Sequence, residues 1–375
     1  MRAPVTPSES ALRAGRRTWA RTFSRMETPA LLRPPARPPD AAAPGASVNA
    51  RPRGGRPARV LVAGRTPSSA ALAAEIARDG RCHVAGVLDD GTRGSDDGAF
   101  PHLGRPADAL ALALALGADT VAIAFSGALP GPVAQALSRA GVRVRPLADV
   151  YEHVTGRVAV ERVGQGWALA APFEPAAPSR AHRAAKRALD VAGSLALALT
   201  CGLALPLVAL AVRLDTPGPV FYTQERVGRG GRRYRVAKFR SMRVGAEDAG
   251  PRWAEPSDRR VTRVGRWLRR THIDELPQAL NVLRGEMSLV GPRPERPEFL
   301  SALEARIPFY RARLTAKPGL TGWAQVNYGY GRTVEDALVK LQYDLHYLRR
   351  PSLLADIGIL ARTVAVVVRR WRAEG

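Results

Sequence analysis

Residues 186–215 read KRALDVAGSLALALTCGLALPLVALAVRLD, and this stretch decides which class of fold the chain can adopt. Between Val191 and Val212 no residue is charged. A straight helix over that run would be roughly 33 Å long, which matches the hydrocarbon core of a bilayer. Because a buried helix of a soluble protein rarely has such a long run without polar interruption, we expect a membrane segment here.

Basic residues flank the apolar run on both sides. Lys186 and Arg187 precede it, Arg213 follows it, and further arginines come soon after at positions 226, 229, 232 and 233. Since cytoplasmic flanks carry the excess of positive charge, both ends are expected on the cytoplasmic side. A single span cannot satisfy that, whereas a helix that breaks and returns can. Pro206 would supply the break by removing a backbone donor. The sequence therefore predicts a re-entrant, monotopic helix over about 186–213.

Strand and helix patterns alternate upstream, between residues 58 and 150. Short apolar runs such as ARVLVAG (58–64) alternate with helical stretches such as SSAALAAEIARDG (68–80), which has serines at its start and a glycine after its end. This alternation predicts a parallel sheet covered by helices, that is, a small Rossmann-like domain. Its first turn holds only Gly64 where a dinucleotide fingerprint needs three glycines. A structural or regulatory domain is therefore favoured over a cofactor-binding one.

The other segments complete the expected layout. Residues 1–57 are rich in Pro, Arg and Ala without apolar periodicity, so we expect a disordered basic tail, and no signal peptide is recognised there. Residues 151–182 form a connector, and 183–375 form a second domain. The expected fold class is α/β: an N-terminal Rossmann-like parallel-sheet domain (58–150), then a mainly helical α+β monotopic membrane domain with the re-entrant helix.

The charge balance narrows the choice of partners. The chain has 57 Lys and Arg against 33 Asp and Glu, a formal net charge of +24, which implies nucleic acid, a membrane surface or phosphorylated substrates. Aromatic residues are only 6%, and no basic run is interleaved with them as in single-strand binders. The uncharged run also disfavours a simple soluble nucleic-acid binder. The two cysteines, Cys82 and Cys201, have no ligand-like neighbours, which argues against disulfide and zinc frameworks.

An acidic pair stands out in THIDELPQALNVLRGEMSLVGPRPERPE (271–298). Asp274 and Glu275 come just before Pro277, and proline is tolerated only in a first helical turn, so a helix is expected to begin near 271–274. Free N–H groups at a helix start favour anions. For an isolated Asp-Glu pair an ordinary helix start is the simplest interpretation. The basic motifs on either side of the pair favour a phosphate-binding site over an ordinary helix start.

Basic residues surround the pair along the chain. Arg269 and Arg270, together with the helix start, are expected to keep Asp274 ionised, as a nucleophile or metal ligand must be. The motifs KFRSM and GPRP add further candidates for binding phosphate: Lys238, Arg240 and Arg293, the last held between Pro292 and Pro294. Arginines suit diphosphate oxygens, and a few carboxylates among them suit Mg²⁺, which completes its shell with phosphate and water. The pattern predicts a magnesium-assisted site for a phosphorylated substrate.

Three stretches carry a resemblance to a known family. KRALD to KFRSM (186–242), residues 260–299, and KPGLTGWAQVNYGYG (317–331) occur in this order. Together they resemble the bacterial sugar transferase family, the monotopic phosphoglycosyl transferases that act as undecaprenyl-phosphate hexose-1-phosphate transferases. The resemblance covers about 183–370, and the ending VEDAL…KLQYDLHYL resembles the branch that serves exopolysaccharide biosynthesis.

The resemblance implies an activity and its setting. A sugar-1-phosphate would pass from a UDP-sugar to undecaprenyl phosphate, giving undecaprenyl-diphosphate sugar and UMP, as the initiating step of exopolysaccharide or glycoconjugate biosynthesis. The implied location is the cytoplasmic face of the bacterial inner membrane. The implied partners are the UDP-sugar, undecaprenyl phosphate and the membrane, with polysaccharide-assembly proteins as further candidates and no nucleic acid. The implied cofactor is Mg²⁺.

The resemblance also implies roles for single residues. Asp274 would be the nucleophile that forms a covalent aspartyl phosphosugar intermediate, and Glu275 would help to hold Mg²⁺. Other positions match the family's basic site and its Pro-Arg-Pro motif, which shapes the nucleotide pocket: Lys238, Arg269, Pro292, Arg293 and Pro294.

The sequence departs from the family in places and leaves other functions open. Leu205 precedes Pro206 where some members have serine, and it stays open whether Arg332 replaces the arginine of a family Asn-Gly-Arg motif. Long members of the family have transmembrane helices before the Rossmann-like domain. No such helices are recognised in the corresponding part of this sequence. The alternatives are a nucleotide-sugar-modifying or nucleotide-sensing protein acting through the N-terminal domain, and a non-catalytic membrane scaffold.

Overall fold

A computed structural model describes residues 57–91, 99–125, 128–160, 178–248, 250, 253, 258–329, 331 and 333–373 of the chain. The expected basic tail, much of the expected connector and Arg332 lie outside these described residues. The predictions made for them therefore stay predictions.

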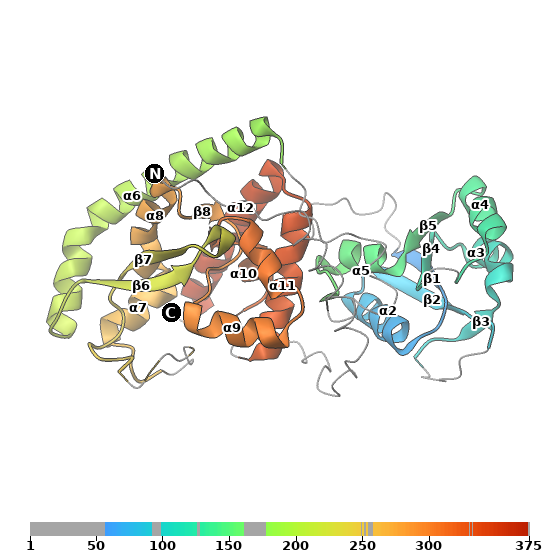
Figure 1. Ribbon diagram of the computed structural model, residues 1–375, viewed down its shortest axis with the longest axis horizontal. Coiled ribbons are helices and arrows are strands. Elements are labelled where there is room, and N and C mark those ends of the chain that lie inside the picture. Colours follow the sequence, from blue (N-terminus) through green and yellow to red (C-terminus); the bar gives the residue numbers. More distant parts are fainter. Residues whose placement is uncertain are drawn as a thin grey trace, which may run out of the picture.

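The N-terminal part is built on a five-stranded parallel sheet with strand order β3-β2-β1-β4-β5 (Figure 1). Its strands are β1 (Ala58–Ala63), β2 (Cys82–Leu88), β3 (His102–Gly104), β4 (Thr120–Ile123) and β5 (Arg143–Pro146). Its helices are α2 (Pro67–Asp79), α3 (Ala109–Leu116), α4 (Gly131–Arg139) and α5 (Leu147–Thr155), with a short turn η1 (Pro106–Asp108). One buried cluster joins the sheet to α2 and α5, and another joins it to α3 and α4. This confirms the predicted parallel sheet with two covered faces; the short edge strand β3 and the helix α5, which runs into the expected connector, were not predicted.

The turn after β1 packs its one glycine against the segment that follows β4. Thr66, rather than the serines expected from the sequence, caps α2 by accepting a hydrogen bond from the Ser69 N–H. A Cβ on Gly64 would lie 2.6 Å from Phe125 and 2.8 Å from Ala128. The single glycine of this turn therefore allows close packing within the fold. The structural or regulatory role expected for this part stays a prediction.

The second half is mainly helical with two small sheets. Its helices are α6 (Arg180–Asp215), α7 (Arg263–Thr271), α8 (Ala279–Arg284), α9 (Pro297–Arg306), α10 (Trp323–Asn327), α11 (Val334–Arg349) and α12 (Leu353–Ala373). The 3-10 turns are η3 (Arg229–Gly231), η4 (Ile273–Gln278) and η5 (Tyr310–Thr315). Strands β6 (Phe221–Val227) and β7 (Arg233–Phe239) form an antiparallel hairpin, and β8 (Ser288–Val290) pairs in parallel with β9 (Gly319–Thr321).

Helix α6 is the one helix among the described residues that is long and apolar enough to cross a membrane, judged by length and composition. Much of its surface is exposed leucine: Leu195, Leu199, Leu203, Leu207, Leu210 and Leu214. The helix runs through Pro206 without interruption, so the expected break is not a gap in the helix. Figure 1 shows α6 curving along its length instead. A proline removes one hydrogen bond and bends a helix without ending it when strong helix formers flank it.

The first half of α6 is fixed to the rest of the second half by buried polar contacts. The Asp190 carboxylate accepts hydrogen bonds from the Ser288 hydroxyl and the Leu289 N–H, both at 2.9 Å. Lys186 Nζ lies 2.8 Å from a carboxylate oxygen of Asp356 in α12, and that side chain is only 1% exposed. Asp356, an acidic residue within the largely apolar helix α12, therefore has a structural partner on α6.

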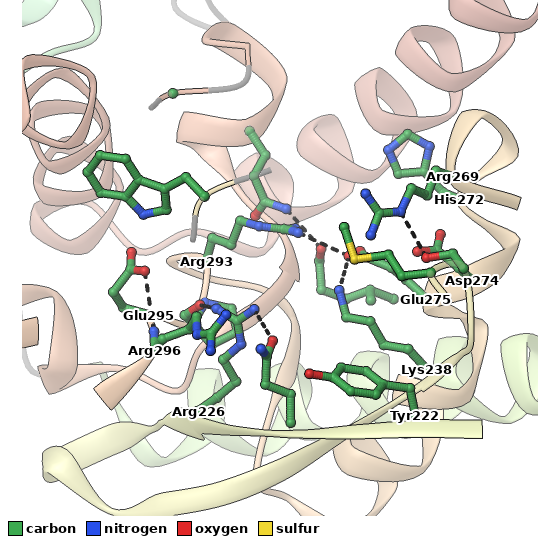
Figure 2. A pocket seen from close by; sticks show the side chains of 18 of the residues that line it. Tyr222, Arg226, Lys238, Arg269, His272, Asp274, Glu275, Arg293, Glu295 and Arg296 are labelled. Atoms are coloured by element: carbon green, nitrogen blue, oxygen red, sulfur yellow. Dashed lines mark hydrogen bonds and ion pairs between the residues drawn. The ribbon is translucent and has the colours of Figure 1, made fainter. Parts of the chain in front are cut away.

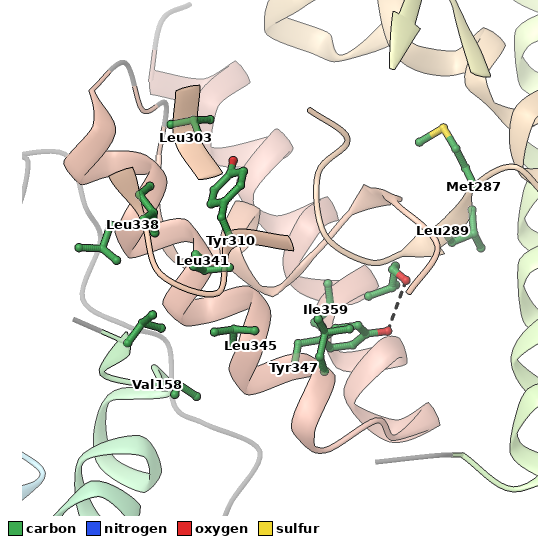
Figure 3. Packing of buried hydrophobic residues seen from close by; sticks show 14 of the residues in the cluster. Val158, Met287, Leu289, Leu303, Tyr310, Leu338, Leu341, Leu345, Tyr347 and Ile359 are labelled. Carbon is green, nitrogen blue, oxygen red and sulfur yellow. Dashed lines mark hydrogen bonds between the residues drawn. The ribbon is translucent and has the colours of Figure 1, made fainter. Parts of the chain in front are cut away.

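The core of the second half also receives residues that follow α5. Figure 3 shows Val158 beside the α11 side chains of this cluster, and the Val158 N–H donates to the Gln342 carbonyl at 3.1 Å. The indole N–H of Trp323 donates to the Gly156 carbonyl at 3.0 Å. The N-terminal part is thus packed directly against α10 and α11.

An ion cluster strengthens this contact. Glu152 of α5, only 2% exposed, contacts His346 Nδ1 at 3.0 Å and pairs with Arg349 of α11. Burial alone would raise the pKa of Glu152, but His346 and Arg349 outweigh it and the pKa falls below its ordinary value. The carboxylate is therefore held ionised between the two halves.

Replacing Glu152 should weaken the chain measurably. We expect Glu152→Ala to lower the free energy of unfolding by about 1–3 kcal/mol, because a buried charge-assisted network is lost. Thermal or chemical unfolding of the purified protein measures this. The matched control is Glu225→Ala, whose 3.8 Å contact with Arg233 joins side chains that are 48% and 65% exposed. That variant should stay within about 0.5 kcal/mol of the parent, and equal effects of the two substitutions would contradict the interface.

Candidate active site

The acidic pair lies directly after a helix end. Helix α7 ends at His272, whose φ of 57° is left-handed, and the chain then enters the 3-10 turn η4, which contains Asp274 and Glu275. Helix α8 continues from this turn and ends at Gly285 in the left-handed region. The predicted helix is present, but its first turn is 3-10 because Pro277 lies inside it.

A cavity of about 610 Å³ opens over the pair (Figure 2). Most of the residues proposed from the sequence line it: Lys238, Arg240, Arg269, Asp274, Glu275, Arg293 and Pro294. Pro292 does not line it; its carbonyl accepts a hydrogen bond from the Gly319 N–H at 2.8 Å and so fixes the Pro-Arg-Pro loop to β9. The folded chain thus collects the predicted residues from β7, α7, η4 and the loop after β8.

Glu275 is held by two cations. Lys238 Nζ lies 2.7 Å and an Arg293 guanidinium nitrogen 3.0 Å from the same carboxylate oxygen, Oε1 (Figure 2). Burial would raise the pKa of Glu275, but Arg293 and Lys238 together hold it well below its usual range. Glu275 is therefore ionised and fixed in orientation.

Asp274 has the opposite environment. Its side chain is buried, and no hydrogen bond to its carboxylate is found within the described ranges. Burial raises the pKa of Asp274 to about 6, the Glu275 charge adds to the rise, and Lys238, Arg269 and Arg293 oppose it only in part. Arg269 does lower the pKa of Asp274, as the sequence led us to expect, but burial outweighs it and the net shift is upward. Desolvation outweighs the dipole of one short turn, and the Arg269 guanidinium is engaged by the Ser241 hydroxyl at 2.8 Å.

Arg240 is bonded to the end of helix α6. Its guanidinium donates to the carbonyls of Thr216 and Pro217, both at 2.7 Å, and to that of Val212 at 3.3 Å. These carbonyls lie at or just beyond the end of α6, where backbone acceptors lack helical partners. These contacts indicate that Arg240 joins α6 to the site, and that its guanidinium is not available to bind phosphate.

Other cations around the cavity were not predicted. Arg226 of β6 donates to the Pro294 carbonyl at 3.1 Å, and buried Arg313 donates to the Arg293 carbonyl at 2.9 Å. Lys340 of α11 also lines the cavity. Arg226 and Lys340 lie in stretches that carry the family resemblance but were not assigned to the site, and only the folded chain brings these cations near the acidic pair.

Three glycines bring the loops under the site together. A Cβ on Gly322 would collide with the Gly291 carbonyl, and one on Gly319 would collide with the Gly291 N–H. The Gly291 N–H donates to the Thr321 carbonyl at 2.9 Å. Backbone thus packs on backbone where the loop that carries Arg293 meets the loop that carries Trp323.

Adding a methyl group at this contact should be costly. We expect Gly322→Ala to destabilise the protein by about 1–3 kcal/mol, because the backbone of Gly291 cannot move aside without shifting Arg293. Unfolding curves measure this. Gly329→Ala is the control, since a Cβ there meets nothing within 4 Å, and it should behave like the parent. A Gly322→Ala variant of unchanged stability would show that the loops are not locked in this way.

Comparison with known proteins gives a consistent set of relatives. The family model described as "Bacterial sugar transferase" matches residues 181–370. A UDP-N-acetylgalactosamine-undecaprenyl-phosphate N-acetylgalactosaminephosphotransferase of Aeromonas hydrophila is 38% identical over 238 residues, 63% of this chain and 54% of that protein. A UDP-glucose:undecaprenyl-phosphate glucose-1-phosphate transferase of Escherichia coli K12 is 43% identical over 188 residues, 50% of this chain and 40% of that protein. An exopolysaccharide production protein PSS of Rhizobium leguminosarum is 40% identical over 193 residues, 50% of this chain and 96% of that protein.

These relatives differ in how much of them the chain covers. The chain spans about half of the Aeromonas protein and less of the Escherichia one, but nearly all of the Rhizobium protein. The family match takes in the apolar helix α6, the acidic pair, the Pro-Arg-Pro loop and most of α12.

Proposed function

The chain belongs to the bacterial sugar transferase family, and on this premise we propose that it transfers a sugar-1-phosphate from a UDP-sugar to undecaprenyl phosphate. The products are then undecaprenyl-diphosphate sugar and UMP. The names of the Aeromonas and Escherichia relatives carry the same donor class and acceptor. The Rhizobium relative supports a place in exopolysaccharide production, and polysaccharide-assembly proteins are then candidate partners.

The observation that carries the proposal is the unequal environment of the two adjacent carboxylates. Glu275 is ion-paired twice, whereas Asp274 is buried with its pKa raised to about 6 and faces the same cavity. A raised pKa makes a carboxylate more basic and more nucleophilic, yet it remains largely ionised at neutral pH. When the pKa values of two neighbouring carboxyl groups are shifted in opposite directions, the two groups serve different chemical roles. Asp274 is the nucleophile, and Glu275 orients the cations.

The chemistry balances in two displacements. An Asp274 oxygen attacks the sugar-bearing phosphorus, the bond from that phosphorus to the bridging oxygen breaks, and UMP leaves. An oxygen of undecaprenyl phosphate then attacks the same phosphorus, the bond to Asp274 breaks, and the carboxylate is regenerated. One diphosphate is exchanged for another, so no ATP is needed. Lys238 and Arg293, fixed on Glu275, neutralise charge on the phosphoryl group, which is the main demand of phosphoryl transfer.

The donor set fits a magnesium ion only in partnership with substrate. The described residues contain no group of three or more His, Cys, Asp or Glu side chains placed to hold a metal. Mg²⁺ is commonly held by one or two carboxylates and completes its shell with phosphate oxygens and water. Glu275, with Asp274 beside it, would hold the ion, which would supply further charge neutralisation on the diphosphate. Addition of EDTA should abolish turnover, and undiminished turnover would remove the metal from the proposal.

The same proposal places the site at the cytoplasmic membrane surface with α6 inserted as a monotopic re-entrant helix. Exposed leucines along a curved α6 support this insertion. Single-cysteine labels in 226–233 and in the N-terminal tail should react from the same, cytoplasmic, side of the membrane. Labelling from opposite sides would contradict a re-entrant helix and favour a span.

The products test the reaction class. The full chain in detergent, supplied with Mg²⁺, undecaprenyl phosphate and a panel of UDP-glucose, UDP-galactose and N-acetylated UDP-sugars, should release UMP with at least one donor. The lipid product should contain the sugar and two phosphates. Release of UDP would instead mean transfer of the sugar without its phosphate, and the proposal would be wrong.

A further inference from the structure

Among the described residues, Lys340 is the partly buried cation of the cavity that the contacts given so far do not explain. The other buried or partly buried cations have partners: Lys238 and Arg293 on Glu275, Arg226 on Gln224, Arg269 on Ser241, Arg296 on Glu247, and Arg313 on Asp344. Lys340 lines the cavity and is partly buried, and no hydrogen bond or ion pair to its ammonium group is found in the part of the chain that the structure describes.

A partly buried ammonium without a partner is costly until an anion meets it. Burial lowers the pKa of Lys340 to about 8, Arg293 and Arg313 add to the fall, and the carboxylates of Glu295 and Asp336 oppose it only in part. Lys340, on α11, therefore lies in the positive electrostatic field of Arg293. Arg293 belongs to the loop after β8 and also binds Glu275. A phosphate placed between them would remove the repulsion between the two cations and restore the lost solvation.

The position of Lys340 favours the nucleotide over the lipid as the source of that phosphate. Helix α11 packs on α9, α10 and η5. Figure 1 shows it on the side of the second half that faces the N-terminal sheet, whereas the C-terminal end of α6 lies on the other side. The lipid phosphate must arrive from the membrane helix, and a soluble nucleotide sugar arrives from solvent. When the sugar-bearing phosphorus of the donor lies at Asp274, the nucleotide-side phosphate is the neighbouring group of the same diphosphate.

We propose that Lys340 binds the nucleotide-side phosphate of the donor and stabilises the departing nucleoside monophosphate, together with Arg293. This inference rests on the proposed function and names the contact for its leaving group. Lys340 then acts in the first displacement and not in the second. A Cβ on Gly331 would lie 2.7 Å from the Lys340 nitrogen, so this glycine lies directly beside the ammonium group.

Binding of UMP tests this directly, using the full chain in detergent with Mg²⁺. Lys340→Met should raise the Kd of UMP in calorimetry by about tenfold or more, as expected for loss of a charged hydrogen bond to phosphate. Lys340→Arg should recover much of the affinity. Arg306→Met is the matched control, since Arg306 is exposed at the end of α9 and does not line the cavity; it removes the same charge and should bind UMP like the parent.

Steady-state kinetics show whether Lys340 binds the phosphate of the nucleotide or that of the lipid. They also test this inference separately from the proposed function. With Lys340→Met, kcat/KM for the UDP-sugar should fall while KM for undecaprenyl phosphate stays unchanged. A raised KM for the lipid with unchanged UMP binding would assign Lys340 to the acceptor and overturn the inference. Parent-like UMP binding in Lys340→Met, with the parent active, would also overturn it. If Lys340→Met loses UMP binding but the parent transfers no sugar phosphate, the inference stands and the proposed function fails.

Discussion

Asp274→Asn should abolish UMP release from UDP-sugars while leaving the protein folded. We expect a loss of at least about 1000-fold in kcat, because removing a nucleophile removes the covalent route altogether. The substitution keeps the side-chain shape. It breaks no hydrogen bond known from the described residues, and it deletes a charge that burial disfavours. The thermal unfolding temperature should therefore stay equal to that of the parent or rise.

This combination of lost activity and retained stability distinguishes a nucleophile from a structural carboxylate. Asp90→Asn is the control: Asp90 is an exposed carboxylate after β2, far along the chain from the site, and its variant should be fully active. Parent-like turnover of Asp274→Asn would show that the nucleophile is assigned to the wrong residue. Loss of activity with loss of folding would instead give Asp274 a structural role.

Arg313→Met should destabilise the protein more than Glu152→Ala or Gly322→Ala. The Arg313 side chain, 5% exposed, lies 2.8 Å from the Asp344 carboxylate, which is 2% exposed. It also donates to the Tyr310 hydroxyl at 2.6 Å and to the Arg293 carbonyl. Removing one partner of a buried pair leaves an uncompensated charge, which costs about 3–5 kcal/mol. Unfolding curves should show this loss, and activity should fall as well because Arg293 loses its backbone support.

A double variant separates the two effects. Arg313→Met combined with Asp344→Leu removes both charges and should recover much of the stability, since a buried pair can be replaced by apolar residues at little cost. Its activity should remain low, because the Arg293 carbonyl still lacks its donor. If the single variant stayed within about 0.5 kcal/mol of the parent, the pair would not be buried as described.

Much of the fold could be predicted from local patterns. The alternation that begins at Ala58 is visible as apolar runs and helix caps, because each strand of a parallel sheet is buried on both faces and each helix needs an end. The strand β3 escaped prediction because three residues are too short to show a period. The continuity of α6 through Pro206 escaped it because a proline alone does not say whether neighbouring turns will hold the helix together.

The candidate site could be predicted only as far as its motifs reach. Asp274, Glu275, Lys238 and Arg293 stand in recognisable stretches, and the structure brings them to one cavity. The direction in which the pKa of Asp274 shifts could not be predicted from sequence, because it depends on burial rather than on which arginines lie next to it in the chain. Lys340 was not assigned to the site either: it stands in the KLQYDLHYL stretch, but only the packing of α11 shows that it reaches the cavity.

Trapping the intermediate tests the central claim most directly. The parent protein is incubated with Mg²⁺ and an accepted UDP-sugar but without undecaprenyl phosphate, then quenched and digested for mass spectrometry. We predict that the peptide containing Asp274 gains a sugar-phosphate, in step with one equivalent of UMP, and loses it when undecaprenyl phosphate is added before quenching. An unmodified Asp274 peptide in an enzyme that still forms the lipid-linked product would contradict the covalent mechanism.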